Sequence, residues 1–421
     1  MWTAGVPAAL DSPGLPAKNG NQTVPAQGGL QMKAIVVGAG IAGLVAARQL
    51  GLAGWQVLVL ERSAAPRPDG YMMDFFGPGV EASERIGLHP YLAEVAYRVE
   101  AAEYMDPGGR VTASLDYLKF ADLAGGNVLS LLRPDMESAA LKALDEVEAG
   151  RVQLRYGVHI ERMEHHGAQV QVWPGGGQPV ETADLLIGAD GIHSAVRAAF
   201  FGPEEDFLSP LGMRAAAFIV HEPALNRQFK NRFVLSDTVD RTAGIYGLRD
   251  SEVASFLVYR QDPLAKLDGT RERLRRIFAG AGGQVDRLLE LCPPDPYDDA
   301  VAQVLMPCWH QRAVVLIGDA AAAVSLLAGQ GGAMAVCAPA ALGDALGPVS
   351  SPEQLPAALD EYERVMRPKI ATAQASGRRA ANSFLPRRKL GLLWRRLILR
   401  STRLPGMDRI IARQIVKRLA K

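Results

Sequence analysis

Short apolar runs alternate with helix-like stretches where the patterned part of the chain begins. Lys33–Val37 is a mainly apolar run, residues 38–52 open on glycines and continue with many Ala and Leu residues, and residues 56–60 (QVLVL) form a second apolar run. A strand, a helix and a strand of these lengths are typical of a βαβ unit. We therefore predict a parallel sheet at the beginning of the fold.

The middle of the chain has a different pattern. Residues 151–173 and 179–187 alternate between apolar and polar positions, and residues 210–260 contain several short strand-like runs without helices between them. The alternation favours antiparallel strands, and residues 210–260 predict a separate, mostly antiparallel sheet. The run AVVLI at 313–317 is again typical of a buried strand and precedes a glycine-rich segment and a long helix. We therefore expect the chain to leave its first layered domain and to return to it.

The charge balance hides an uneven distribution. The 421 residues contain 46 Lys and Arg against 45 Asp and Glu, and 48% are hydrophobic. This balance argues against a generally basic nucleic-acid binder and a highly charged disordered chain, and the length leaves room for two or three domains. Residues 378–421, however, hold 14 Lys and Arg and one acid, Asp408. An acidic body is thus followed by a basic tail.

Three other features bear on the location of the protein. Residues 1–31 are rich in Gly and Pro and lack the pattern of a signal peptide, so we interpret them as a disordered leader. The three cysteines have no CxxC spacing, which indicates neither a disulfide framework nor a cysteine zinc site and fits the cytoplasm. The uncharged stretch 320–343 contains glycines and a proline that make it a poor membrane helix.

Three glycines between the first strand and the first helix form a dinucleotide-binding pattern. Gly38, Gly40 and Gly43 read GxGxxG, and Glu61 closes the second strand. The first glycine permits a tight turn, the second lets the backbone approach a pyrophosphate, and the third allows close helix packing. An acid in the position of Glu61 can accept hydrogen bonds from a ribose and repels a 2′-phosphate. The site therefore favours FAD or NAD over NADP.

Two further Gly-Asp segments extend the pattern. Residues 188–191 (GADG) follow a strand, and Gly318-Asp319 follows the run at 313–317 and leads to GQGG at 329–332. In this order, and with Glu61-Arg62, they resemble the signature of class A flavin-dependent monooxygenases. That is the family of p-hydroxybenzoate hydroxylase, the aromatic polyketide hydroxylases and the tetracycline-inactivating monooxygenases.

The resemblance implies an α/β fold with a Rossmann-like FAD-binding domain of the p-hydroxybenzoate hydroxylase type, an inserted and mostly antiparallel substrate domain, and C-terminal helices. The FAD-binding domain would consist of residues 32–104, 125–204 and 306–370. The substrate domain would consist of residues 105–124 and 205–305, and the basic helices of residues 371–421.

The resemblance also implies cofactor-binding roles around the glycine motif. Glu61 and its neighbour Arg62 belong to the signature. Asp319 resembles the carboxylate that bonds the FAD ribityl chain, and Asp190 is similar to a residue that serves FAD and nicotinamide contacts. Arg133, in the run LLRPD, resembles an arginine that reaches the flavin from a helix start.

Two more residues match the tetracycline-inactivating branch. Arg67 lies where these relatives have an arginine implicated in NADPH binding, and Asp74 matches a flavin-side carboxylate. Each carried-over residue has an alternative interpretation as a surface cap or an ion-pair partner.

The sequence also departs from the family pattern. Ala322, Leu326 and Ala333 stand where many relatives have histidine, proline and asparagine, which removes polar side chains around the flavin. The backbone of Gly331 and Gly332 remains, and a helix beginning there would aim its positive end at the flavin.

The implied reaction uses FAD, NAD(P)H and O2, and forms a C4a-hydroperoxyflavin that hydroxylates an electron-rich ring or enol. We identify no catalytic acid or base and no metal site. Tyr246, Arg249 and Tyr259 are candidates to line a substrate pocket, and an apolar set favours a bulky hydrophobic substrate: Met72, Phe75, Phe76, Phe218, Phe233 and Phe256. Alternatives are a prenyl-lipid reductase, a halogenase, or a flavoprotein that acts only as a binding module. Monomer and homodimer are both open.

The basic tail has a helical pattern of its own. Between residues 391 and 421, apolar and arginine positions recur at helical intervals, and Pro405-Gly406 divides them into two helices. Such helices either pack on the acidic enzyme body, which we favour, or lie on an anionic membrane surface.

Overall fold

The computed structural model describes residues 31–68, 70–117, 121, 126–261, 269–388 and 390–392. The expected leader, apart from residue 31, and the expected tail helices beyond residue 392 lie outside the described residues. Both interpretations therefore stay predictions.

A six-stranded sheet forms the first layer, in the order β18-β19-β11-β1-β2-β7. Its strands pair in parallel except for the edge strand β18, and the apolar runs that predicted it are buried, as expected for a sheet covered on both faces. The bounds are Lys33–Val37 (β1), Gln56–Leu60 (β2), Val152–Arg155 (β7), Leu185–Gly188 (β11), His310–Gln311 (β18) and Val314–Leu316 (β19). The predicted βαβ start and the return of the chain to this sheet are confirmed.

Helices rich in small residues pack against this sheet. α1 (Ile41–Leu52) is buried on nearly all sides, because its Ala and Gly residues let the sheet and α11 (Gly331–Leu346) approach closely. Three further helices lie on the same core: α2 (Pro78–Arg85), α3 (His89–Val95) and α5 (Arg133–Lys142).

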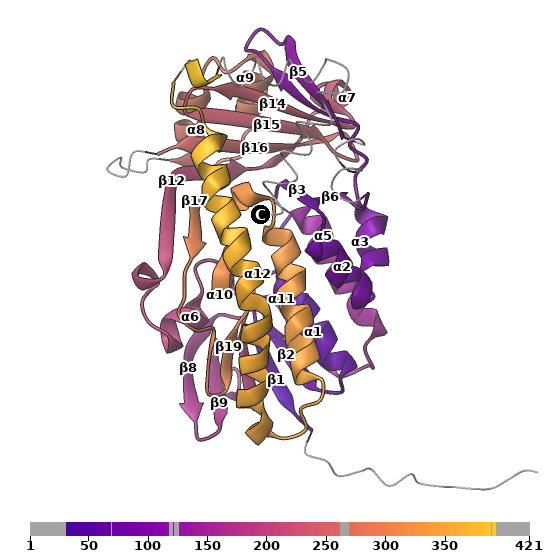
Figure 1. The fold of residues 1–421 in the computed structure, drawn as a ribbon, viewed down its shortest axis with the longest axis vertical. Coiled ribbons are helices and arrows are strands. Elements are labelled where there is room, and N and C mark those ends of the chain that lie inside the picture. Colours follow the sequence, from indigo (N-terminus) through magenta and orange to yellow (C-terminus); the bar gives the residue numbers. More distant parts are fainter. Residues whose placement is uncertain are drawn as a thin grey trace, which may run out of the picture. The chain divides into compact units, whose positions relative to one another are not determined.

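A second, eight-stranded sheet has the order β17-β12-β16-β15-β14-β4-β5, with β13 paired to β16. Its pairs are antiparallel except for β14 with β4, which confirms the predicted mostly antiparallel sheet. Three helices cover one of its faces (Figure 1): α7 (Pro223–Phe229), α8 (Thr270–Phe278) and α9 (Gly283–Glu290). The strands are β4 (Ala101–Met105), β5 (Val111–Asp116), β12 (Leu208–Ala217), β13 (Ile219–His221), β14 (Arg232–Thr238), β15 (Arg241–Gly247), β16 (Glu252–Arg260) and β17 (Tyr297–Val304).

A two-stranded ribbon of β3 (Met72–Phe75) and β6 (Leu129–Leu132) lies between the two cores. Because side chains alternate along a strand, its two faces meet different neighbours. Phe75 and Leu131 are buried in the core of the six-stranded sheet, whereas Leu132 packs with Tyr246 of the eight-stranded sheet. The ribbon therefore separates the two layers and presents one face to each.

The remaining elements are short. A three-stranded antiparallel sheet joins β8 (Ile160–His166), β9 (Gln169–Pro174) and β10 (Glu181–Ala183), which confirms the antiparallel prediction for these strands. For the two ends of the predicted stretch it was wrong, because β7 and β11 belong to the six-stranded sheet and pair there in parallel. The short helices are α6 (Ala195–Phe200), α10 (Asp319–Ala322), and the 3-10 turns Ala143–Glu146, Glu204–Asp206, Leu326–Ala328 and Pro352–Gln354. In the part of the chain that the structure describes, no helix has both the length and the apolar character to span a membrane.

The longest helix, α12 (Leu355–Phe384), belongs to both cores. Leu359 and Met366 pack in the core of the six-stranded sheet, and Ala381 packs with Met213 and Val258 of the eight-stranded sheet. Figure 1 shows α12 running beside α11 and on toward the strands of the eight-stranded sheet. The expected boundary between residues 370 and 371 thus falls inside one continuous helix.

Candidate functional site

The glycine motif forms a tight turn that excludes other residues at two of its positions. Gly38 has φ +105°, and a Cβ there would lie 2.5 Å from the carbonyl oxygen of Ala189. A Cβ on Gly43 would overlap the carbonyl oxygen of Gly38, so α1 packs directly on the turn. The nearest atoms to a Cβ on Gly40 are Glu137 Oε1 at 3.5 Å and Arg133 Nη2 at 3.9 Å. This turn therefore faces the start of α5.

Glu61 joins the glycine turn from the end of β2. Its Oε2 accepts a hydrogen bond of 2.8 Å from the backbone N–H of Ala39, and its Oε1 accepts one of 2.9 Å from that of Ser63. Burial raises the pKa of the carboxyl, but these hydrogen bonds outweigh it and leave the pKa below its ordinary value. The site therefore holds an ionised carboxylate beside the glycine turn.

Arg133 enters the same space from the first position of α5. Its Nη2 lies 2.6 Å from Glu137 Oε1, one helical turn further on. Burial raises the pKa of Glu137, and the charges of Arg133 and Arg67 oppose this rise. Arg67 and Arg62 are exposed, and the charge of Arg67 also acts on Glu61. Arg67 and Arg133 thus place positive charge beside the glycine turn, whereas Arg62 lies at the surface.

The carboxylate of the Asp-Gly segment is hydrogen-bonded within its own loop, and its expected contacts with FAD and nicotinamide stay predictions. Asp190 Oδ1 accepts a hydrogen bond of 2.5 Å from Ser194 Oγ, and Oδ2 accepts one of 3.1 Å from the N–H of Val196. Burial raises the pKa of Asp190, and these bonds oppose the rise. The carboxylate thereby fixes the loop whose Ala189 carbonyl contacts Gly38.

The buried Arg197 connects this loop to the Gly-Asp segment. Its Nη2 donates to the carbonyl oxygen of Ile192 at 2.6 Å, and its Nη1 donates to that of Ala320 at 3.0 Å. Burial lowers the pKa of the guanidinium, while Glu204 opposes this. One cation therefore joins the two family segments.

Asp319 begins α10 directly after Gly318, where a Cβ would lie 3.0 Å from Ala42 of α1. Its side chain is exposed, yet surrounding protein desolvates it and raises its pKa, and Arg133 opposes the rise. This combination is expected for a group that lines a deep recess. Burial, the charge of Asp319 and, in opposition, that of Arg133 together raise the pKa of Tyr71 to about 12. Asp319, Tyr71 and Arg133 therefore share one space.

The start of α11, at Gly331 and Gly332, is open on one side and packed on the other. No protein atom lies within 4 Å of a Cβ placed on Gly331, whereas a Cβ on Gly332 would overlap the sulfur of Met73. The first turn of α11 therefore offers free backbone N–H groups toward open space on one side and is fixed by the ribbon on the other. Ala333 is buried against Gly79 of α2, where only a small side chain fits.

These residues fit a long, two-part phosphate cofactor. The glycine turn and the N-terminus of α1 suit a pyrophosphate, Glu61 suits ribose hydroxyls, and the recess between Asp319 and α11 remains open for a ring system. The expected positions near Gly38, Glu61, Arg133, Asp319 and Gly331 converge on this space. Their individual contacts with FAD stay predictions.

Asp74 lies on the ribbon next to Met73, and its expected contact with the flavin stays a prediction. Met73 faces α11, so the neighbouring Asp74 points from the opposite face of the ribbon toward the eight-stranded sheet. Its Oδ1 accepts hydrogen bonds from Tyr117 Oη and, at 3.1 Å, from Ser130 Oγ. The alternation of strand β3 could have indicated this orientation from the sequence.

The face of the eight-stranded sheet toward the ribbon is aromatic and incompletely buried. Phe233 stacks on Tyr246 with ring centroids 4.2 Å apart, and Phe256 lies 5.4 Å from the ring of Tyr71. Phe233, Phe256 and Tyr71 are partly exposed, so space remains between the ribbon and the sheet. Tyr297, at the start of β17, is 40% exposed, and the charges of Asp319 and Arg133 reach it.

Tyr71 and Tyr297 were not singled out as site residues by the sequence. Tyr71 follows a glycine in a short segment without a motif, and Tyr297 precedes two aspartates in a strand whose pattern gives no signal for it.

Several expected pocket residues have other positions. Phe218 and Tyr259 lie on the opposite face of the sheet, against α8, where Tyr259 Oη donates to Asp298. Phe75 is buried in the core of the six-stranded sheet. Arg249 stacks on Tyr97 and pairs with Asp135 at the surface. Of the candidates, Met72, Phe233, Tyr246 and Phe256 lie between the ribbon and the sheet.

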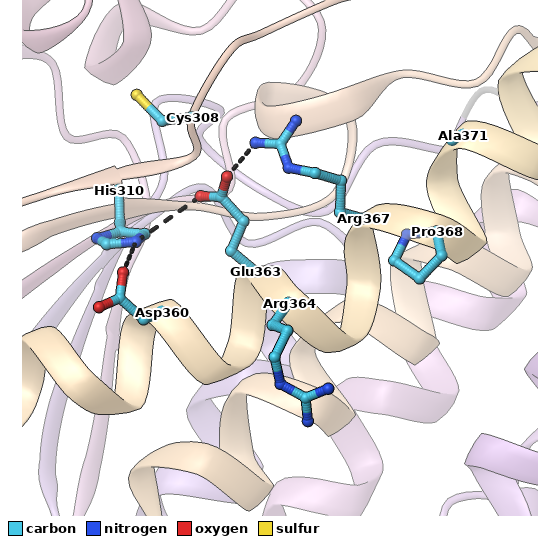
Figure 2. Close-up of a pocket in the computed structure, with 8 residues that line it drawn as sticks. All are labelled: Cys308, His310, Asp360, Glu363, Arg364, Arg367, Pro368 and Ala371. Atoms are coloured by element: carbon cyan, nitrogen blue, oxygen red, sulfur yellow. Dashed lines mark hydrogen bonds and ion pairs between the residues drawn. The ribbon is translucent and has the colours of Figure 1, made fainter.

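A separate surface pocket of about 720 Å³ lies beside α12. Figure 2 shows His310, Glu363 and Arg367 directed toward one another, with Cys308 nearby. His310 Nε2 lies 3.2 Å from Asp360 Oδ1, and Glu363 pairs with Arg367 and accepts a 2.8 Å hydrogen bond from the N–H of Trp309. Its charged groups thus pair with each other. Within the described ranges, no group of His, Cys, Asp and Glu residues is arranged to hold a metal ion.

Comparisons with known proteins agree with this geometry. Residues 31–375 match the FAD binding domain family. An uncharacterized protein of Mycobacterium tuberculosis (strain ATCC 25618 / H37Rv) is 32% identical over 348 residues, which cover 79% of this chain and 87% of that protein. A flavin-dependent monooxygenase of an unknown prokaryotic organism is 27% identical, with 84% and 90% covered.

Solved structures have the same fold. The tetracycline destructase Tet(55) has a TM-score of 0.74 and 25% identity, covering 91% of this chain and 97% of its own. The family match spans most of the chain, and its motifs, its fold and its relatives agree. The chain therefore belongs to the FAD binding domain family, and it is a class A flavin-dependent monooxygenase with FAD as its cofactor.

Proposed function

We propose that this chain uses FAD, NAD(P)H and O2 to hydroxylate a bulky, largely apolar aromatic or polyketide-like small molecule. One observation carries the substrate class. The charge of Asp319 reaches both Tyr71 and the partly exposed Tyr297, and the ring of Tyr71 lies 5.4 Å from that of the partly exposed Phe256. An apolar aromatic lining favours a flat hydrophobic ligand over a small acid.

Most of the proposed FAD contacts follow from charge and backbone geometry. Glu61 would accept hydrogen bonds from the adenosine ribose, and the turn at Gly38–Gly43 with the N-terminus of α1 would hold the pyrophosphate. Arg133 would neutralise phosphate charge from the facing helix. Asp319 would bind the ribityl hydroxyls, and the first turn of α11 at Gly331 and Gly332 would direct its N–H groups at the flavin ring.

Two further residues have different proposed roles. Arg67, exposed beside the glycine turn, is proposed to contact NAD(P)H during its transient binding. Asp190 is proposed to serve contacts with FAD and the nicotinamide from the loop that its hydrogen bonds hold in place.

The bound flavin supplies the redox chemistry by which one oxygen atom of O2 enters the substrate and the other leaves as water, with two electrons from NAD(P)H. The side chains of this chain orient the substrate and exclude water. Met72 of the ribbon and Phe233 of the sheet supply apolar walls, and Tyr71 and Tyr297 supply hydroxyl groups at the border of the recess.

The test begins with purified full-length protein. We expect it to retain FAD, to oxidise NADH or NADPH faster when an aromatic substrate is added, and to incorporate labelled oxygen from ¹⁸O2 into that substrate. Asp319→Ala should weaken FAD retention. A protein that binds FAD but never consumes NAD(P)H with a broad aromatic panel would favour the binding-module alternative. A protein without flavin, and without any effect of Asp319→Ala, would remove the basis of the proposal.

We also propose a cytoplasmic location and a basic tail that packs on the acidic enzyme body. The free thiols of Cys292, Cys308 and Cys337 support the first point, and the charge difference between body and tail supports the second. Cell fractionation tests the location, liposome binding tests the alternative membrane contact of the tail, and light scattering decides between monomer and homodimer.

A further inference from the structure

The side chain that α5 brings closest to the glycine turn is acidic. A Cβ on Gly40 would lie 3.5 Å from Glu137 Oε1 and 3.9 Å from Arg133 Nη2, and both side chains come from α5. The Glu137 side chain is 8% exposed, and its Oε1 lies 2.6 Å from Arg133 Nη2. The turn that suits a pyrophosphate therefore faces an ion pair whose negative member is nearer to it than the positive one.

Charged and titratable groups from several elements surround Glu137. Burial raises the pKa of Glu137 above its ordinary value, the charges of Arg133 and Arg67 oppose this rise, and the charge of Glu61 adds to it. Burial, followed by the charges of Glu137 and Glu61, raises the pKa of Tyr156, which follows β7. The first turn of α1 contributes no charged side chain. Two acids thus flank the glycine turn, and Arg133 is the cation in contact with one of them.

The two acids differ in how they can meet a pyrophosphate. Glu61 keeps its charge because backbone N–H groups donate to both of its oxygens. Glu137 has the Arg133 guanidinium as its counter-charge. If Arg133 turns its N–H groups to phosphate oxygens, Glu137 loses this counter-charge and gains negative neighbours in a site with little water, where repulsion between like charges is strong. Both changes favour the protonated form of the carboxyl group.

We propose that FAD binding is linked to the uptake of one proton by Glu137, which frees Arg133 to bind the pyrophosphate. Without the cofactor, Glu137 is ionised at neutral pH and paired with Arg133. On binding, this ion pair separates, the Arg133 N–H groups donate to phosphate oxygens, and a proton from the buffer forms an O–H bond on a Glu137 oxygen. The inference rests on the proposed FAD contacts of Arg133 and the glycine turn, and it adds to them a dependence on pH.

The direction of this dependence follows from the proton. Binding raises the pKa of Glu137 further, starting from a value in the FAD-free chain that already lies above the model-peptide value of 4.5. Between these two pKa values, FAD affinity should fall about tenfold for each unit rise in pH. Below both values the carboxyl group is already protonated, and above both it stays ionised, so the affinity is constant there. The diphosphate of FAD is ionised throughout and takes up no proton.

The test measures FAD affinity and proton uptake with full-length protein. Equilibrium dialysis between about pH 5 and about pH 9 gives the affinity, and calorimetry in two buffers with different enthalpies of ionisation gives the number of protons taken up. Glu137→Gln has the same shape as the wild-type side chain but accepts no proton. We expect this variant to take up none, to match wild-type affinity in acid, and to bind FAD at least about tenfold more tightly than wild type at alkaline pH.

Two comparisons show whether the proton belongs to Glu137. Glu94→Gln alters an exposed acid that pairs with Lys142 of the same helix α5, and this matched control should behave as wild type. ADP-ribose carries the ribose and the pyrophosphate of FAD but no flavin, so wild-type protein should take up the same proton with it. Uptake with FAD but not with bound ADP-ribose would assign the proton to Asp319, whose pKa burial also raises, and would overturn the proposal.

Two other results would also overturn the proposal: wild-type protein that binds FAD without taking up a proton, and Glu137→Gln protein with the pH profile of wild type. The wild-type measurement stands even if the variant fails to fold. Failure of the proposed function itself would look different. It would show as wild-type protein that binds no FAD at any pH, and this inference would then fall with it.

Discussion

Arg197 donates a 3.0 Å hydrogen bond to the backbone carbonyl of Ala320, and through it the loop that packs on the glycine turn is tied to the loop that carries Asp319. The arginine is 0% exposed, and its charge is compensated by the carbonyl groups, by Glu204 and by the nearby carboxylate of Asp190. The two loops that enclose the recess are therefore held at a fixed separation.

Replacing this arginine should damage both stability and cofactor binding. Arg197→Met removes the link and leaves the carbonyls of Ile192 and Ala320 without a donor, so we expect a loss of about 3 kcal/mol in the free energy of unfolding. FAD affinity should fall as well. Urea denaturation and FAD titration measure the two effects. Arg364→Ala, at an exposed ion pair on α12, should change stability by less than about 1 kcal/mol.

Gly331 is a position where a substitution should weaken FAD binding without affecting the stability of the fold. A Cβ at this position meets no protein atom within 4 Å, so Gly331→Ala should fold with native stability, yet the methyl group would enter the space assigned to the flavin. We expect weaker FAD binding, measured by equilibrium dialysis. Gly283→Ala, the equivalent first position of α9 with equally open surroundings, is the control. Equal FAD affinity in both variants would contradict the assignment of α11 to the flavin.

Glu61 should contribute to stability in a defined range of pH. Its pKa in the folded chain lies below the model-peptide value of 4.5, so its contribution is complete above about pH 4.5 and disappears as the pH falls through the folded-state pKa. Glu61→Gln should therefore flatten the acid side of a plot of urea midpoint against pH. A substitution of the exposed Glu84 on α2 provides the comparison. Identical curves for wild type and Glu61→Gln would refute this prediction.

A substitution of Tyr297 should weaken substrate binding and leave FAD binding unchanged. Tyr297→Ala removes an aromatic surface at the border of the recess, and we expect KM to rise about 10-fold, the equivalent of one aromatic contact of about 1.4 kcal/mol, with FAD retention unchanged. Leu305→Ala, just beyond the other end of β17 and 43% exposed, should leave KM unaltered. Steady-state kinetics with a substrate found in the panel decide the point.

The position at which the C-terminus is shortened should matter. A chain that ends after Ser376 loses Ala381 and Leu385 from the core beneath the eight-stranded sheet, and it loses the hydrogen bond from Asp240 N–H to the carbonyl of Pro386. Its melting temperature should drop by several degrees. A chain that ends after Leu392 keeps these contacts. If its melting temperature also drops, the tail packs on the body; if it stays while liposome binding is lost, the tail is a membrane contact.

The sequence predicted the parallel sheet, the return of the chain and the cofactor side of the site because these depend on local rules. A strand followed by glycines and a small-residue helix has few other folds available, so Gly38 and Glu61 could be placed from the pattern alone. The substrate side could not be placed in this way. Phe218, between β12 and β13, and Phe233, in β14, have similar sequence surroundings, but they pack on opposite faces of the eight-stranded sheet. Only the pairing of strands and the helices packed on one face decide which of them borders the recess.

Asp74 illustrates a further limit. Matching it to a family position indicated its neighbourhood but not its direction, which alternation along a four-residue strand determines. Its partners Tyr117 and Ser130 are 43 and 56 residues away in the chain, so no short motif could have indicated the cluster.

The shared helix α12 restricts how the substrate site can open. Its 30 residues measure about 45 Å, and its two ends are embedded in different cores. A hinge motion between the two sheets would have to bend α12 or pull Ala381 out of its packing, at a cost of several kcal/mol. We therefore expect access for substrate and for NAD(P)H to come from movements of loops, or of the flavin within its recess, rather than from a hinge between the two sheets.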